Sequence, residues 1–264
     1  DSMLTDLSRF GYNNSGSVIG SPTVSDGIEK WGKTWGKSIL IVSKSRDRID
    51  FNSTNDDFNF GTGSNFSLSV WCKRFDISTG SADPNISSSA NESAPAATGS
   101  TNRAQSIFGR GAYSDSYGID YHVDTRKIRV GVNGGNPVPA GASSKSYLLS
   151  VDAPTTDANL TQSFHHIVFT YESGSSTGMK VYVDGELKGT KTTTGTDFPF
   201  TGSNAGGDFV TSSAANAGTG QRLHLGGPHV VGSSQRHFSG YLQYPRVYSK
   251  AISQDEVWSL YTKP

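Results

Sequence analysis

The sequence predicts an all-β fold: a two-sheet antiparallel sandwich with one short helix near the C-terminus. Three observations support this prediction. Apolar residues recur at every second position in many short segments, turn residues separate those segments, and no strand–helix–strand rhythm occurs. With 31 glycines among 264 residues and only 17% charged residues, the composition also favours short strands joined by many turns.

The first clear strand spans residues 66–72. Phe66, Leu68, Val70 and Cys72 alternate with Ser, Trp and Lys, so one face of this strand should lie against a core. Cys72 is the single cysteine, which excludes an intrachain disulfide. Its place in the alternation indicates that the thiol packs as a small apolar side chain.

Two hairpins follow along the chain. The segments 119–123 and 127–132 alternate in the same way and are separated by a short polar turn. The strands 165–171 and 179–183 lead to Asp184-Gly185, directly before another short segment. Because a two-residue type I′ turn needs positive φ at both positions, Asp-Gly between apolar alternations is a strong hairpin signal.

The C-terminal region contains a short strand at 223–225 and the one predicted helix. Ser253 and Glu256 have the spacing of a capping box, in which each side chain bonds the other residue's backbone N–H. Val257, Leu260 and Tyr261 follow at helical spacing, so we expect one or two helical turns here.

Three long stretches interrupt the pattern: 78–105, 133–163 and 190–221. All are polar and poor in large aliphatic residues, and loops of this length are usually either functional or disordered linkers. If consecutive strands run antiparallel, 78–105 and 190–221 emerge at the same end of the sandwich and 133–163 at the other. That rim would suit a binding function, although loops also grow at little cost in closure entropy.

Charge and hydropathy exclude several classes of protein. Lys+Arg and Asp+Glu both number 23, so the net charge is zero, which argues against a nucleic-acid clamp or a polybasic membrane-surface module. No apolar run approaches the ~18 residues that span a bilayer, and we expect no membrane insertion. No signal peptide is evident, so an export signal would have to lie outside this chain.

Several short motifs resemble, in order, those of laminin-G-like, concanavalin A-like jelly-roll domains. They fall at 66–71, 164–171, 180–185, 223–227 and 238–253, with Asp6-Leu7-Ser8 and Trp35-Gly36-Lys37-Ser38 at matching N-terminal places. The resemblance implies a jelly-roll sandwich that forms one domain over residues 1–264.

The segment 58–63 looks especially like versions of this domain from tail, fibre and surface proteins of bacterial viruses. Members of the family mostly bind glycans or proteins or act as structural spacers, and the fold alone does not choose among these roles. The resemblance therefore implies an extracellular or virion-surface location. Its expected partners are a cell-surface glycan or protein receptor, neighbouring structural subunits, and further copies of the chain.

Many relatives bind calcium through acidic residues, because this hard cation needs six to eight oxygen ligands. Here Ser239 and Gln243 replace two of those acidic residues, and 44–48 is basic where relatives are acidic. We therefore expect no cofactor, with a calcium ion at Asp6 as the alternative.

Catalytic motifs are missing. Jelly-roll glycanases carry two carboxylates on alternate residues of one strand, whereas the glutamates here are isolated, at Glu29, Glu92, Glu172, Glu186 and Glu256. The six histidines show no zinc-binding spacing. The sequence predicts that the protein is not an enzyme.

Aromatic residues in expected loops are candidates for ligand binding, because sugar rings stack on exposed aromatic faces. Trp35 and Trp71 occupy framework positions of the family and are expected in the core. The candidates are Trp31, Tyr113, Tyr117, Phe198 and Phe200.

These expectations lead to three hypotheses for the function of the protein. The leading hypothesis is a non-enzymatic adhesion or decoration module, on a virion or another extracellular assembly, that binds glycan or a protein neighbour through loops at one rim. The alternative is a purely structural subunit whose loops contact sister chains. A third hypothesis is a carbohydrate-active enzyme with an unfamiliar carboxylate pair.

Overall fold

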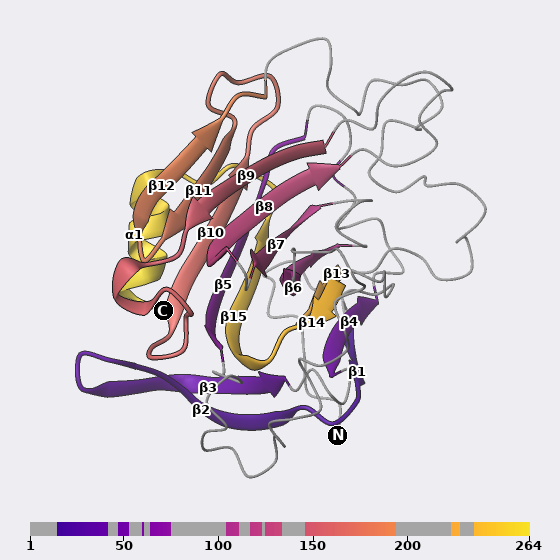
Figure 1. The fold of residues 1–264 in the computed structure, drawn as a ribbon, viewed down its shortest axis with the longest axis vertical. Helices are drawn as coiled ribbons and strands as arrows, with labels where there is room; N and C mark the ends of the chain where they lie inside the picture. The colour runs from indigo at the N-terminus through magenta and orange to yellow at the C-terminus, as the bar shows by residue number, and fades with distance from the viewer. Residues whose placement is uncertain are drawn as a thin grey trace, which may run out of the picture.

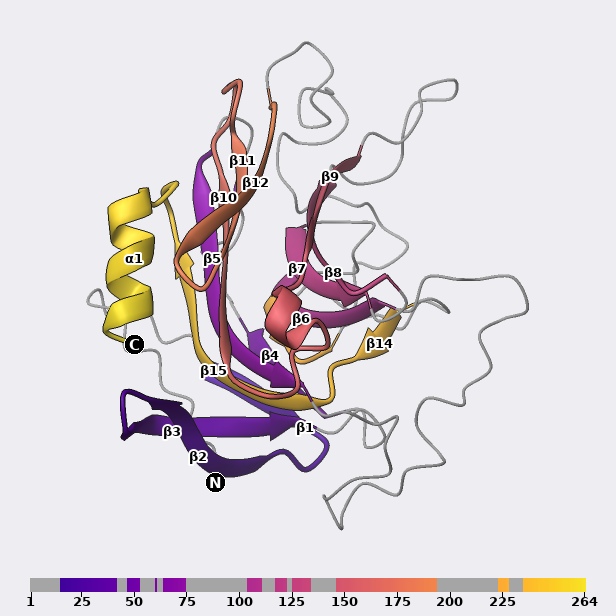
Figure 2. The ribbon, with the colours of Figure 1, turned by 60° about the vertical axis from the view of Figure 1, so that its left-hand side comes forward.

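The computed structural model describes residues 15–41, 47–52, 60, 64–74, 104–110, 117–122, 125–133, 146–193, 223–227 and 235–264. Two antiparallel sheets face each other, and a C-terminal helix, α1 (Gln254–Thr262), lies on the outside of one of them (Figures 1 and 2). The predicted all-β jelly-roll sandwich is therefore confirmed.

The first sheet, sheet A, has eight strands. Along the sheet the order is β1 (Ser15–Ile19), β4 (Arg48–Asn52), β13 (Leu223–Leu225), β6 (Ala104–Arg110), β7 (Tyr117–His122), β8 (Lys127–Asn133) and β9 (Ser146–Asp152). The short strand β14 (Gln235–His237) pairs in parallel with β6, while the other pairings in this sheet are antiparallel.

The second sheet, sheet B, has seven strands. Their order is β12 (Glu186–Lys191), β11 (Met179–Val183), β10 (His165–Tyr171), β5 (Phe66–Arg74), β15 (Gly240–Tyr248), β3 (Lys33–Ile41) and β2 (Thr23–Lys30). All its pairings are antiparallel.

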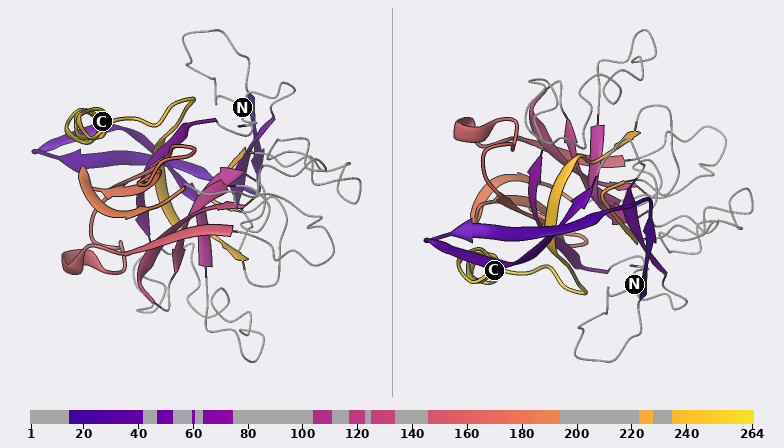
Figure 3. Two further views of the ribbon diagram at one scale, coloured as in Figure 1. Left: turned by 90° about the horizontal axis from the view of Figure 1, so that it is seen from above. Right: turned by 90° about the horizontal axis from the view of Figure 1, so that it is seen from below.

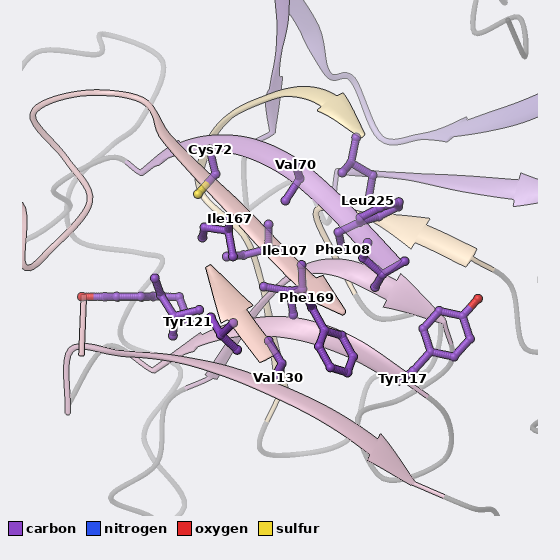
Figure 4. Packing of buried hydrophobic residues seen from close by; sticks show 14 of the residues in the cluster. Val70, Cys72, Ile107, Phe108, Tyr117, Tyr121, Val130, Ile167, Phe169 and Leu225 are labelled. Carbon is purple, nitrogen blue, oxygen red and sulfur yellow. The ribbon is translucent and has the colours of Figure 1, made fainter. Parts of the chain in front are cut away.

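The core lies between the two sheets and is built from their alternating inward side chains. Figure 4 shows Val70, Ile167 and Phe169 of sheet B meeting Tyr121 and Val130 of sheet A. Cys72 is fully buried with a free thiol, as its place in the alternation predicts. Burial raises the pKa of this thiol well above its usual value.

Both predicted hairpins are present. β7 pairs with β8, and β11 pairs with β12 across Asp184-Gly185. Asp184 and Gly185 have φ angles of 54° and 83°, as a type I′ turn requires. Ser253 and Glu256 form the expected capping box at the start of α1.

The prediction of one long loop over 133–163 is wrong. It contains the strand β9 and a short 3-10 helix, η3 (Thr155–Asp157). The alternating Tyr147, Leu149 and Val151 could have indicated this strand, but polar neighbours on both sides obscure it. The other two long stretches lie mostly outside the described residues, although 104–105 belong to β6 and 190–191 to β12.

The additional strand also changes which loops share an end of the sandwich. Arg74, which precedes the first stretch, and Gln105, its last residue, lie at one end, since Arg74 Nε donates to Gln105 Oε1 at 2.8 Å. Lys191, the second residue of the third stretch, lies at the opposite end. It pairs with Met179, which pairs with Tyr171, and Tyr171 pairs with Phe66 at the start of β5. Leu223 is at the same end as Lys191, because it pairs with Arg110, the last residue of β6. The expectation that 78–105 and 190–221 leave from one rim is therefore wrong: β9 reverses the direction of every later strand.

The segment 153–164 closes the end of the sandwich near Arg74. Leu160 is fully buried there, and its carbonyl accepts the Arg74 backbone N–H at 2.7 Å. The Tyr121 hydroxyl donates to the Ala158 carbonyl at 2.7 Å. Asp157 organises this segment by accepting backbone N–H groups from residues 161, 162 and 163 at 2.8, 2.7 and 3.1 Å.

Candidate functional site

A long hairpin formed by β2 and β3 extends beyond the sandwich at the edge of sheet B (Figures 1 and 3). Its two turn residues are Trp31 and Gly32, with φ angles of 53° and 71°. Two positive φ angles define a type I′ turn, the same geometry as at Asp184-Gly185. The hairpin tip therefore holds a tryptophan where such turns normally have Asn, Asp or Gly.

Trp31 is both exposed and strained. Its side chain is 60% exposed, the second highest value among the large hydrophobic residues of the described chain. The left-handed conformation costs an ordinary L-residue about 1–2 kcal/mol, and a bulky residue with positive φ is rare. A strained, exposed tryptophan that neither packing nor turn chemistry explains is typical of a functional site.

A change to asparagine tests this interpretation. Trp31→Asn should leave the free energy of unfolding unchanged or raise it by up to about 1 kcal/mol, because Asn tolerates positive φ and only an exposed cation–π contact is lost. Urea denaturation monitored by circular dichroism would measure the difference. A loss above about 1 kcal/mol would instead make Trp31 a structural residue.

Lys30 connects the hairpin tip to the C-terminal helix. Its ammonium donates to the Tyr261 carbonyl at 2.7 Å and lies 3.0 Å from the Tyr261 ring centroid. The ring centroids of Trp31 and Trp71 are 4.4 and 4.9 Å away. Burial lowers the pKa of Lys30 to about 8, partly opposed by the charge of Asp184. Three aromatic rings therefore surround one lysine ammonium.

Helix α1 adds a second exposed tryptophan. Trp258 is 51% exposed, and its ring lies 5.6 Å from that of Tyr261, three residues later on the same helix face. Val257, on the other face, is buried with Val168, Tyr182 and Ile252 and holds the helix on sheet B. We call the surface formed by Lys30, Trp31, Trp258 and Tyr261 the aromatic platform.

Gly185 allows the platform to form. A Cβ atom at this position would lie 2.7 Å from Cε3 of Trp258 and 3.1 Å from Cδ1 of Tyr261. The residue thus serves two purposes, because it also has the positive φ of the β11–β12 turn.

Buried rings form the floor beneath the platform. Trp71 stacks on Tyr261 with ring centroids 5.7 Å apart, and on His166 at 4.9 Å. The contact of His166 Nε2 with Ser69 Oγ is 2.9 Å. Burial, followed by the nearby Arg246 charge, lowers the pKa of His166 to about 3, so this ring is neutral at physiological pH.

The predicted site residues have different outcomes. Trp31 lies in a turn, as expected, and is part of the aromatic platform. Tyr117 does not lie in a loop: it begins β7, is 2% exposed, and packs 4.8 Å from the Phe66 ring. Its position on the inward face of the strand removes it from any surface site. Tyr113, Phe198 and Phe200 lie outside the described residues.

Asp6 lies outside the described residues, and those that the structure describes contain no group of three His, Cys, Asp or Glu side chains able to hold a metal ion. Gln243 has a structural role instead: its Oε1 accepts the Ile28 N–H at 2.8 Å and its Nε2 donates to the Trp35 carbonyl at 2.5 Å. A carboxylate at this position could not donate the second bond.

Lys30, Trp258 and Tyr261 were not among the site residues predicted from the sequence. The spacing of Trp258 and Tyr261 shows that they share a helix face, but only the fold brings that face to the tip of a hairpin more than 200 positions earlier. Within the described part of the chain, no helix has both the length and the hydropathy to cross a membrane.

Two facing antiparallel sheets, with the connections described above, define a concanavalin A-like jelly-roll sandwich. The chain belongs to the Laminin_G_3 family, described as the concanavalin A-like lectin/glucanases superfamily, whose model matches residues 45–258. This match confirms the resemblance found in the sequence. Within the platform, Lys30 and Trp31 precede the matched region and Trp258 is its last residue.

Solved structures show the same fold at low sequence identity. The receptor-binding domain of the botulinum neurotoxin C/D mosaic serotype has 15% identity and a TM-score of 0.56 over 96% of this chain and 47% of that one. The ligand-binding domain of botulinum neurotoxin serotype D, in complex with N-acetylneuraminic acid, has 15% identity and a TM-score of 0.57 over 96% and 46%.

A third similar structure is the binding domain of Paraclostridial Mosquitocidal Protein 1, with 14% identity and a TM-score of 0.53 over 95% of this chain and 48% of that one. The chain thus spans about half the length of these structures. No curated protein matches it.

Proposed function

We propose that the protein is a non-enzymatic glycan-binding module and that the aromatic platform is its binding surface. One observation supports this above all: two exposed tryptophans, Trp31 and Trp258, are linked through Lys30 and Tyr261 into one continuous surface.

The chemistry of the platform suits a saccharide. A pyranose ring has an apolar face that packs on an aromatic ring and an edge of hydroxyl groups that needs polar partners. Trp31 and Trp258 would supply the faces, and the Lys30 ammonium between them would supply a donor. A flexible sugar chain could contact both rings, which lie on different elements.

The similar structures support a binding role. Those named above are described as receptor-binding, ligand-binding or binding domains, and one of them holds a sugar acid. Binding without catalysis agrees with the absence of the paired-carboxylate motif in the sequence. In this proposal the module works on an extracellular assembly, of which a virion surface is the most specific case.

Alanine substitutions of the two tryptophans test the platform. Trp31→Ala and Trp258→Ala should each weaken glycan binding about 10-fold or more, because stacking on an aromatic side chain is worth about 0.5–1.5 kcal/mol beyond the area that it buries. A glycan array identifies the ligand, and isothermal titration calorimetry measures each variant against it.

Val18→Ala is the matched control. Val18 is also an exposed large hydrophobic residue, 47% exposed, but it lies on β1 in sheet A, away from the platform. Its removal should leave the affinity unchanged, and circular dichroism should show the same fold in all three variants. Binding that survives both tryptophan substitutions would place the ligand elsewhere. Binding only to sister chains would favour the structural-subunit hypothesis.

A further inference from the structure

Two lysines lie at the tip of the β2–β3 hairpin. Lys30 and Lys33 face each other directly across the two strands, on either side of Trp31-Gly32. Among the described residues, neither ammonium has a carboxylate within 4 Å, whereas Lys37 on the same hairpin pairs with Asp26 at 2.6 Å. Like charges placed directly opposite each other destabilise a strand pair.

Two unfavourable features therefore coincide at one turn. The strained φ of Trp31 and the facing lysines both reduce the stability of the hairpin. Lys30 gains a compensating contact with Tyr261. Lys33 is exposed, and no described contact offsets its charge. Features that lower the stability of the fold and have no structural role are typical of functional sites.

We infer that the aromatic platform selects acidic saccharides, with a sugar ring on Trp31 and its carboxylate or sulfate group held between Lys30 and Lys33. This inference rests on the proposed function and narrows its ligand class. An acidic sugar complements both features of the tip: its ring covers the exposed aromatic face, and its anionic group is attracted by the two lysine side chains.

Charge distribution favours a sugar over an anionic membrane surface. A bilayer would contact the whole projecting hairpin, on which Glu29 is exposed and the Lys37–Asp26 pair is neutral, so little net attraction remains. A single sugar acid contacts only the tip, where the two unpaired lysines lie. The second tryptophan is on α1, whose first turn carries Asp255 and Glu256 and would repel anionic lipid.

Matched pairs of ligands test the charge requirement separately from sugar binding. One pair is 3′-sialyllactose and lactose, and the other is oligogalacturonate and its neutral methyl ester. Both pairs are included in a glycan array that contains acidic and neutral saccharides. The acidic member of a bound pair should bind about 10-fold more tightly in dilute buffer. This preference should fall as sodium chloride is raised, because the contacts are exposed.

Variants of the lysines locate the effect. Lys33→Gln should reduce the preference for the acidic ligand about 3- to 10-fold and leave neutral affinity unchanged. Lys37→Gln removes the same charge from the same hairpin away from the tip and should change nothing. Lys30→Gln is a second variant, expected to reduce the preference while also loosening the hairpin from α1.

The outcomes separate the two proposals. Equal binding of acidic and neutral partners, or an unchanged preference in Lys33→Gln, would overturn the inference and leave the glycan-binding function intact. Absence of binding to every saccharide would overturn both. Binding to phosphatidylserine vesicles without binding to free sugars would also overturn both, in favour of a lipid surface.

Discussion

Asp157→Ala is expected to lower the free energy of unfolding by about 3–5 kcal/mol, since the substitution leaves buried charge and several donors uncompensated. Asp157 is 4% exposed, and its carboxylate accepts three backbone N–H groups of the segment that closes the sandwich. It also lies 3.1 Å from Nε2 of the buried His165, whose Nδ1 is 2.7 Å from Asp184. Asp157→Ala removes all of these contacts at once.

The pH dependence of this effect follows from the two titrating groups. Burial opposes the charged form of His165, but Asp184 and Asp157 outweigh it and raise the pKa of the imidazole above 6.5. Burial likewise opposes ionisation of Asp157, but the backbone donors and His165 outweigh it and lower the pKa of the carboxyl below 3.8. The histidine contribution is complete below pH 6.5 and is lost as pH rises through its folded-state pKa. The aspartate contribution is complete above pH 3.8 and is lost as pH falls through its folded-state pKa.

The difference in the free energy of unfolding between wild type and Asp157→Asn should therefore be largest between about pH 4 and 6.5. Guanidinium denaturation at a series of pH values measures this difference. Asp152→Asn is a control because that carboxylate is exposed and its ion pair with Lys127 lies at the surface. A constant difference across this series would show that the His165 pairing does not contribute to stability.

Phe66→Ala should cost about 3–5 kcal/mol, because it leaves a cavity within a cluster of aromatic rings. Phe66 is fully buried at the end of the sandwich opposite Asp157. Its ring centroid lies 4.7 Å from Phe60, 4.8 Å from Tyr117, 5.2 Å from Tyr171 and 5.6 Å from Phe169. The rings of Tyr117, Phe169 and Tyr171 belong to strands of the two facing sheets, so they cannot readily fill the space.

Phe66→Leu is the matched variant and should cost clearly less, since it retains most of the apolar volume. Chemical denaturation of both variants at pH 7 gives the comparison. A loss below about 1 kcal/mol in Phe66→Ala would mean that this end of the sandwich is loosely packed, and Tyr117 would again be a candidate surface residue.

Local sequence signals predict the body of the fold well. The alternation over 66–72 is β5, the Asp184-Gly185 turn has the expected φ angles, and the capping box begins α1. Each depends on residues close together in the chain, so the physics that determines them is present in the sequence pattern. β9 is the exception, because its short alternation lies among polar residues.

The candidate site was predictable only in part. Trp31 was a candidate because it lies in an expected loop, and the structure places it, exposed, at a hairpin turn. Tyr117 was placed on the wrong side of a strand boundary, where one residue decides between loop and core.

Local sequence patterns specify the class of fold, the two hairpin turns and the burial of Cys72, because strand alternation, turn chemistry and capping act over a few residues. Long-range packing sets which ends of the sandwich the long stretches leave from and which aromatic residues meet. Tyr261 binds Lys30 across 231 positions of sequence, and no local preference encodes a contact that arises when a C-terminal helix packs beside an N-terminal hairpin.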